Sequence, residues 1–322
     1  MLTEISLNRK IANAAICLFD LPETVSMTLI NLSENATFKV EVADGRCFAL
    51  RVHREGYHSH LAIASELAWL MDLRESGVAI TPRPIRGRDG ALIQLVGGRH
   101  VVLFEWENGI EPGIDEDLIV PFEQLGAIAA RMHAHVNTWK KPESFQRFTW
   151  DFETSLSGAR PHWGHWQNGV GVDVARLNLF GRTVELIGER LAAYGKGPAR
   201  FGLIHGDLRL ANLLIDGPHV KVLDFDDCGF GWHMYDAVTP LSFFEHGHQV
   251  PSLIEAWKTG YRTVAVLEKA DEFEIPTFVM MRRLLLVAWI GSHSETVLAQ
   301  SLGVGYTEGT DGLCEAYLKR YG

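Results

Sequence analysis

Residues 203–227 hold three polar side chains at fixed spacing between apolar segments, and this pattern restricts the fold more than any other part of the sequence. Asp207 follows one apolar segment, Asn212 comes five residues later, and Asp224 lies twelve residues beyond Asn212. The turn signal at residues 216–217 would bring the second apolar segment back beside the first. We therefore expect these polar groups to lie on loops that project from packed segments, with Asn212 close to Asp224.

Such a set of side chains suits phosphoryl transfer to a hydroxyl group. The carboxylate of Asp207 would accept or orient the hydroxyl proton, and the oxygens of Asn212 and Asp224 would hold Mg²⁺ on the phosphates. Oxygen ligands suit a hard cation, and the lack of a nearby Cys/His pair in the sequence argues against zinc.

The hydrophobic period of the sequence changes near residue 106. Before this point, alternating apolar residues and a hairpin signal at residues 44–45 predict strands, and one stretch repeats with the period of a helix. The expected small lobe, residues 1–106, is a five-stranded antiparallel sheet with one helix. Its strands are expected at residues 27–32, 36–43, 46–54, 91–96 and 99–106, and its helix at residues 59–74.

After residue 106 the pattern is mainly helical, and the expected large lobe covers residues 107–322. Pro251 and Pro276 each stand where the first residue of a helix is expected. The predicted fold is therefore α+β and bilobal. The helices of the large lobe are expected at residues 122–139, 174–194, 251–267 and 276–293, and short apolar stretches at residues 201–204 and 219–225.

The composition argues against several classes of protein. The net charge of -10 disfavours a nucleic-acid partner, which would need a basic surface. The four cysteines are widely spread and form no CxxC pair, as in a reducing compartment. The longest apolar run, residues 284–290, is far shorter than the roughly 20 residues of a membrane-spanning helix. We expect a cytoplasmic protein with no membrane partner, and the sequence leaves the oligomeric state open.

Residues 205–226 resemble the catalytic and metal-binding loops of the kinase superfold, an HxD-x4-N sequence followed by a DFG-like Asp. Gly206 and the Asp-Phe-Asp sequence at 224–226 make the segment similar to the aminoglycoside phosphotransferase/choline kinase family rather than to the protein kinases. Residues 48–54 (FALRVHR), 104–106 (FEW) and 224–227 (DFDD) resemble its branch of homoserine-kinase-like and stress-response-kinase-like bacterial proteins.

This resemblance covers about residues 25–290 and implies a kinase-like fold that uses ATP and Mg²⁺, with an N-terminal nucleotide-binding lobe. Asp207 would be the catalytic base, and Asn212 and Asp224 would bind the metal. The turn that covers the nucleotide would include Ser33 and Asn35. The other implied roles are a cation on the third strand, Arg51; its partner on the next helix, Glu66; a hinge that faces adenine, Phe104, Glu105 and Trp106; and supports of the catalytic loop, His205, Asp226 and Asp236.

Two features depart from the wider superfold, and a further residue, Arg209, has two interpretations. Arg51 stands where a lysine is usual; its guanidinium can still pair with phosphates and with Glu66 in a fork, although it is bulkier. The covering turn has no GxGxxG sequence. Arg209 would neutralise charge on the transferred phosphate, or would be a loop residue that faces solvent or Asp226.

Three hypotheses of function follow. The first is a small-molecule kinase whose acceptor is an amino alcohol or a homoserine-like, choline-like or aminoglycoside-like hydroxyl compound. The second is a protein serine/threonine kinase on the same scaffold. The third is a nucleotide-binding pseudokinase with a regulatory role, for which Arg51 and the glycine-poor turn are the motive.

Two other clusters favour packing over chemistry. His133 and His135 lie two residues apart on a predicted helix and so point to different faces, which disfavours a shared metal. The tryptophans at positions 139, 150, 163 and 166 would form an aromatic box for a cationic acceptor, or would pack a long insertion onto the helical lobe; we favour packing.

Overall fold

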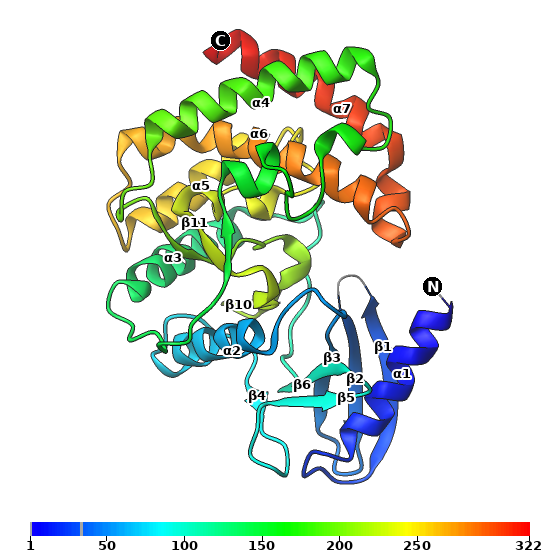
Figure 1. Ribbon diagram of the computed structural model, residues 1–322. Coiled ribbons are helices and arrows are strands. Elements are labelled where there is room, and N and C mark those ends of the chain that lie inside the picture. Colours follow the sequence, from blue (N-terminus) through cyan, green and yellow to red (C-terminus); the bar gives the residue numbers. More distant parts are fainter. Residues whose placement is uncertain (1, 33–34) are drawn as a thin grey trace. The chain divides into compact units, whose positions relative to one another are not determined.

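The computed structural model describes residues 2–32 and 35–322, and these form two compact units (Figure 1). The N-terminal unit runs to Ile110 and also contains Lys140–Arg147 and Lys221–Asp226. The C-terminal unit contains Glu111–Trp139, Phe148–Val220 and Asp227–Gly322. The chain thus returns twice to the N-terminal unit, and the second return carries Asp224 and Asp226 into it.

The N-terminal unit is built on an antiparallel sheet of six strands in the order β1-β2-β3-β6-β4, with β5 also paired to β6. The predicted fold class therefore agrees, but the strand count exceeds the predicted five. The additional strand is β4, which contains Pro84 and lies at the edge of the sheet, where a residue without an N–H group is tolerated. The strands are β1 (Thr24–Leu32), β2 (Ala36–Val42), β3 (Cys47–Val52), β4 (Pro84–Ile85), β5 (Ile93–Val96) and β6 (Arg99–Glu105).

Two helices belong to this unit, one more than predicted. Helix α1 (Leu2–Ile16) lies against the sheet (Figure 1), with Ile11, Ala12 and Ala15 in the same buried cluster as Phe38 of β2. Helix α2 (His60–Glu75) begins where predicted, because the Ser59 side chain accepts a hydrogen bond from the N–H of Ala62. This cap fixes the helix that carries Glu66.

The C-terminal unit consists of five long helices and a three-stranded sheet in the order β7-β11-β8 (Figure 1). The strands β9 and β10 pair around a turn at Gly217. The helices are α3 (Ile119–Val136), α4 (Val174–Tyr194), α5 (Val250–Arg262), α6 (Lys269–Ser292) and α7 (Val297–Tyr321). The strands are β7 (Phe148–Trp150), β8 (Phe201–Ile204), β9 (Leu213–Asp216), β10 (His219–Val222) and β11 (Gly229–Trp232).

Helix α6 begins earlier than the sequence pattern predicted. Glu268 and Asp271 form a capping box that starts the helix at Lys269, and Pro276 lies inside it rather than at its first position. The prediction that Pro276 begins the helix was therefore wrong, because the capping box lies outside the apolar pattern used to place the start. The longer helix is almost wholly buried through its second half, which includes Arg282 and Arg283.

Helices α3 and α5 pack closely because each has a glycine at the contact. A Cβ atom at Gly126 would overlap the backbone carbonyl of Trp257, and one at Gly260 would overlap that of Glu123. The missing side chains allow the two backbones to approach, so this contact depends on residue size.

We expect the substitution Gly260→Ala to destabilise the protein by about 1–3 kcal/mol or more, because rigid backbone leaves no space for the methyl group. Urea unfolding would measure the loss. The control is Gly312→Ala on α7, where a Cβ meets nothing within 4 Å and the side chain would face solvent. Helix propensity should make that variant equal to the parent or up to about 1 kcal/mol more stable. Equal effects of the two substitutions would contradict this account of the contact.

Candidate active site

Arg51 is the centre of a buried charge cluster in the N-terminal unit. Its Nη1 atom donates a hydrogen bond of 2.7 Å to Oε1 of Glu66, so the expected strand–helix pair forms. Its Nη2 atom lies 3.2 Å from Oδ1 of Asp224, and its Nη1 atom lies 4.0 Å from Asp226. The guanidinium also stands 5.0 Å from the centre of the Phe104 ring.

These carboxylates and the guanidinium change one another's pKa values. Burial opposes the charged form of Arg51, but Glu66, Asp224 and Asp226 outweigh burial and raise the arginine pKa above its ordinary value. Burial raises the pKa of Glu66, and Arg51 offsets only part of that change. Arg51 therefore remains positively charged. Its guanidinium contacts two carboxylates, those of Glu66 and Asp224, through two nitrogen atoms, whereas a lysine would have a single ammonium nitrogen.

Asp226 connects Asn35 to this cluster. Its Oδ2 atom accepts a hydrogen bond of 2.9 Å from the side-chain amide of Asn35, and its Oδ1 atom lies 3.3 Å from Nε2 of His58. The other end of the Asn35 amide accepts from the N–H of Arg54 at 3.1 Å. Asn35 therefore anchors the end of the turn through its side chain, while Ser33 lies outside the described residues.

The charge on Asp226 is strongly favoured. Burial would raise the pKa of this carboxyl, but His58, His53 and Arg51 together hold it well below its ordinary value. Burial also lowers the pKa of His53 to about 3, with Asp226 opposing the change. His53 is therefore neutral near pH 7, and Asp226 is ionised.

Asp224 adopts an unusual backbone conformation, with φ at 53°. Among the described residues, Phe243 is the only other non-glycine residue with a positive φ. The next residue, Phe225, is fully buried and packs edge-on against Trp69 at 5.5 Å between ring centres. This packing holds the segment in a conformation that costs free energy, as is common at functional sites.

The predicted hinge forms the end of β6. Phe104 is buried, Glu105 is exposed and Trp106 is half-buried, with Lys39 lying 5.3 Å from the Trp106 ring centre. The N–H of Glu105 donates to the carbonyl of Arg83 at 2.8 Å, and that of Trp106 donates to the carbonyl of Cys47 at 3.3 Å. These two N–H groups are therefore not offered to adenine in this conformation.

In the C-terminal unit, the carboxylate of Asp207 receives three side-chain donors. Its Oδ1 atom accepts from Nη2 of Arg282 at 2.5 Å. Its Oδ2 atom accepts from Nε of Arg209 at 3.1 Å and from Nδ2 of Asn212 at 2.9 Å. Burial opposes ionisation, but the two arginines outweigh it and lower the pKa of Asp207. Asp207 is therefore a fixed, ionised carboxylate and a weak base.

A second buried carboxylate, Asp236, holds the backbone on the N-terminal side of Asp207. Its oxygens accept from the N–H of His205 at 3.0 Å and from that of Gly206 at 2.8 Å. Gly206 has a φ of 81°, and a Cβ there would lie 2.9 Å from the carbonyl of Asp227, so glycine is required at this bend. Asp236 therefore contacts the loop that it was predicted to support, and the His205 side chain accepts from the N–H of Asp207 at 3.2 Å.

His133 completes the support from helix α3. Its Nε2 atom lies 3.0 Å from Oδ2 of Asp236, and its Nδ1 atom lies 3.3 Å from the hydroxyl of Tyr261 on α5. Burial opposes the ionised form of Asp236, and the hydrogen bond from His133 is the largest contribution that lowers its pKa. Both ring nitrogens of His133 therefore have partners within the protein, and His135 is half-buried.

Sequence analysis missed two residues of this arrangement. Arg282, just before the apolar run at residues 284–290, was given no role, and His133 was assigned to packing or to the surface. The available signal for Arg282 was a charged residue inside a long apolar helix, because such a residue is rarely buried without a partner. Of the tryptophan cluster, Trp150, Trp163 and Trp166 are buried, which agrees with packing, whereas Trp139 is half-buried. The Trp163 ring centre lies 5.1 Å from the guanidinium of Arg282.

The donor set fits a hard cation. In the C-terminal unit, the Asn212 nitrogen donates to Asp207, so its amide oxygen is turned away from that carboxylate and can serve as a ligand. In the N-terminal unit, Asp224 supplies a carboxylate. Within residues 2–32 and 35–322, no group of three or more His, Cys, Asp and Glu side chains could hold a metal ion. Amide and carboxylate oxygens are the ligand types that a hard cation prefers.

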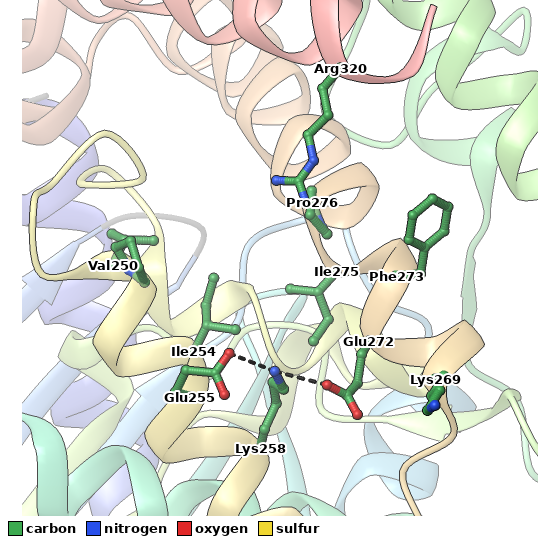
Figure 2. Close-up of a pocket in the computed structure, with 11 residues that line it drawn as sticks. Val250, Ile254, Glu255, Lys258, Lys269, Glu272, Phe273, Ile275, Pro276 and Arg320 are labelled. Atoms are coloured by element: carbon green, nitrogen blue, oxygen red, sulfur yellow. Dashed lines mark hydrogen bonds and ion pairs between the residues drawn. The ribbon is translucent and has the colours of Figure 1, made fainter.

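A separate groove of about 510 Å³ lies between α5, α6 and the end of α7 (Figure 2). The Lys258 ammonium lies between Glu255 at 2.6 Å and Glu272 at 2.9 Å, so its charge is balanced. None of the predicted site residues lines this groove. Within the part of the chain that the structure describes, every helix is too short or too polar to cross a bilayer.

Comparison with known families gives a match to the model described as the phosphotransferase enzyme family over residues 27–273. The chain belongs to this family. The predicted family, fold class and kinase activity are thereby confirmed.

Individual relatives of this phosphotransferase are small-molecule kinases. The solved structure of a microcompartment-associated aminopropanol kinase is 42% identical, covers 97% of this chain and 98% of its own, and has a TM-score of 0.89. An amicoumacin kinase of Bacillus subtilis (strain 168) is 25% identical over 79% of this chain and 76% of its own length. An amicoumacin kinase solved with AMP-PNP, Ca²⁺ and its substrate is 18% identical, covers 99% of this chain and 96% of its own, and has a TM-score of 0.77; it shows the same fold. These relatives agree with the first of the three hypotheses of function, a kinase for small molecules.

The buried imidazole of His233 should make the stability of this phosphotransferase sensitive to acid. Burial is the main cause that lowers its pKa to about 3, and the adjacent His133, with which it stacks at 4.4 Å, contributes to the same shift. The unfolded chain binds this proton from about pH 6.5 downward and the folded protein does not, so stability falls with pH. Between pH 6.5 and 5 this residue should cost about 2 kcal/mol.

The test compares urea unfolding of parent and His233→Gln protein at pH 7.5 and pH 5. The variant should lose less stability over this interval, by about the same 2 kcal/mol. His246→Gln, at an exposed loop position, serves as the control and should lose as much as the parent. An acid sensitivity unchanged by His233→Gln would disprove this assignment.

Proposed function

We propose that this phosphotransferase moves the γ-phosphate of ATP to the hydroxyl group of an amino alcohol, with Mg²⁺ as the metal. The observation that carries the reaction type is the carboxylate of Asp207, fixed by donors from Arg282, Arg209 and Asn212. Support for the acceptor class comes from the 42% identity to an aminopropanol kinase over 97% of this chain. The N-terminal unit would bind the nucleotide, and the C-terminal unit would bind the acceptor.

Asp207 would act on the acceptor hydroxyl. As the oxygen–phosphorus bond forms, the bond from the γ-phosphorus to the bridging oxygen breaks, ADP leaves and the hydroxyl proton passes to the Asp207 carboxylate. The lowered pKa of Asp207 makes it a poor base before transfer, so the proton would move late and the main task of this residue is orientation. A late proton transfer suits a loose transition state, in which the bond from the phosphoryl group to ADP is largely broken before the bond to the acceptor oxygen is complete.

The remaining residues would manage negative charge. Asn212 and Asp224 would hold Mg²⁺, which supplies neutralisation of the phosphate oxygens when bound. Arg51, fixed by Glu66, would offer its guanidinium to the phosphates, and the backbone near Asn35 would cover them. Phe104, Glu105 and Trp106 would lie beside the adenine, with Phe104 also supporting the arginine. Arg209 would place a second cation beside Asp207.

The decisive assay measures ADP release and the phosphorylated product, by mass spectrometry, with ATP, MgCl₂ and paired acceptors. Aminopropanol and ethanolamine should be phosphorylated, and 1-propanol, which lacks the amine, should not. Asp207→Asn should lower kcat by about 10³-fold or more, since the hydroxyl loses its fixed acceptor. Asp216→Asn, at an exposed turn of the same segment, should keep parental activity. Phosphate on protein rather than on small molecules would instead favour the protein-kinase hypothesis.

Nucleotide binding can be tested apart from transfer, by thermal melting with ATP and Mg²⁺. ATP at a hundred times its Kd should stabilise the parent by about 2.7 kcal/mol. The Mg²⁺-dependent part of this gain should vanish in Asp224→Ala and persist in Asp44→Ala, a control at an exposed hairpin turn of the same unit. A gain without any transfer to an acceptor would favour the pseudokinase hypothesis, and no gain with any nucleotide would refute the proposed nucleotide site.

A further inference from the structure

Two consecutive arginines, Arg282 and Arg283, lie in the buried part of α6, and each is 1% exposed. A guanidinium removed from water costs several kcal/mol unless hydrogen bonds and an opposite charge compensate it. Both residues meet this condition, but with different partners. Successive helical residues point about 100° apart, so the pair addresses two separate sets of acceptors.

Arg283 has purely structural partners. Its Nη1 atom donates to Glu245 at 2.8 Å, its Nε atom donates to the hydroxyl of Thr310 at 2.7 Å, and its Nη2 atom donates to the carbonyl of Tyr306 at 2.6 Å. Glu245 in turn accepts from the hydroxyl of Tyr306 and from the N–H of Phe243. These contacts join α6, α7 and the turn at residues 242–245.

Arg282 also binds that turn, but it reaches further. Its Nε atom donates to the hydroxyl of Ser242 at 2.9 Å, and its Nη1 atom donates to the hydroxyl of Tyr235 at 3.2 Å. Its Nη2 atom donates to Oδ1 of Asp207 at 2.5 Å, and its guanidinium lies 5.1 Å from the ring centre of Trp163. Of the two arginines, only Arg282 has Asp207 as a partner.

The donors around Asp207 differ in what they can fix. Arg209 and Asn212 lie two and five residues after Asp207 on the same loop, and both bind Oδ2. Arg282 binds the other oxygen and comes from a different, rigid helix. A carboxylate has about four acceptor positions, so these three donors from described residues leave about one for a hydroxyl group.

We propose that Arg282 is a positioning residue of phosphoryl transfer, which fixes the rotation of the Asp207 carboxylate so that its remaining acceptor position faces the acceptor hydroxyl. The inference rests on the proposed function of Asp207. Arg282 acts through Asp207 and does not touch the transferred group. Three of its donor atoms are committed to three oxygens, so the guanidinium geometry, and not the charge alone, sets the position of the carboxylate.

Arg283 supplies a matched control because it is the neighbouring residue, is equally buried and supports the same turn. We would compare Arg282→Lys with Arg283→Lys, each of which keeps a positive charge and removes the guanidinium fork. Arg282→Gln is the stronger variant. Steady-state kinetics with ATP, MgCl₂ and aminopropanol would give kcat and both KM values, and thermal melting would give the structural cost of each substitution.

The lysine variants should show a similar fall in Tm and different kinetics. Arg282→Lys should lower kcat about 10-fold and Arg282→Gln about 10²-fold, because a misplaced catalytic group costs rate rather than nucleotide affinity. The KM for ATP should stay within about twofold. Arg283→Lys should keep kcat within about twofold of the parent. If Arg282→Gln fails to fold, the lysine pair still gives the comparison.

Equal kcat losses in the two lysine variants would overturn the inference and assign both arginines to stability alone. A parental kcat in Arg282→Lys and in folded Arg282→Gln would overturn it as well. A loss confined to the KM for ATP would place the effect in nucleotide binding and also reject it. A parent protein that transfers no phosphate to any alcohol would refute the proposed function and this inference with it, whereas the other outcomes leave the proposed function in place.

Discussion

The loop that carries Asp207 depends on the hydrogen bonds that its backbone donates to the carboxylate of Asp236. This carboxylate is fully buried, and it can remain charged there only because it receives two backbone N–H groups and His133. The two backbone donors come from the residues immediately before Asp207, so this buried charge fixes the loop rather than a side chain. The carboxylate of Asp207 is then held by Arg282 on α6, and His133 lies on α3. Helices distant in the sequence thus determine the geometry of one loop.

The N-terminal unit is also organised around a buried charge that several groups compensate, but there the central charge is positive. A buried guanidinium, Arg51, is surrounded by three carboxylates, and its planar fork holds Glu66 and Asp224 at once. A lysine ammonium is compact and would satisfy fewer of these groups in fixed directions. The departure from the usual lysine is therefore matched by the surrounding acids, and Asp226 extends the cluster to Asn35 at the end of the covering turn.

Local patterns in the sequence predicted much of this protein, and long-range contacts account for what they missed. The alternation of Phe38, Val40 and Val42 predicted a strand because burial on one face of a sheet imposes that period. The pair of Arg51 with Glu66 followed from the family resemblance, with which the order of strand and helix agreed. Arg282 could not be placed, because its partner Asp207 lies 75 residues away and no periodic signal links the two. The early start of α6 depends on a capping box and not on the hydrophobic period. Strand β4 has only two residues, which is too short a stretch to show a hydrophobic period.

The second return of the chain to the N-terminal unit has a consequence for biosynthesis. Residues 221–226 belong to this unit, and Asp226 is the carboxylate that meets Asn35 and His58. While the ribosome has made only the first 110 residues, Asn35, His58 and Arg51 have no partner at position 226, and Arg51 also lacks Asp224. The unit that begins the chain can therefore reach its final charge balance only after about two thirds of the protein has been synthesised, so its completion is post-translational or late co-translational rather than strictly sequential. Fragments that end at the apparent boundary near residue 106 would keep the pair of Arg51 with Glu66 but would lack the carboxylates of Asp224 and Asp226.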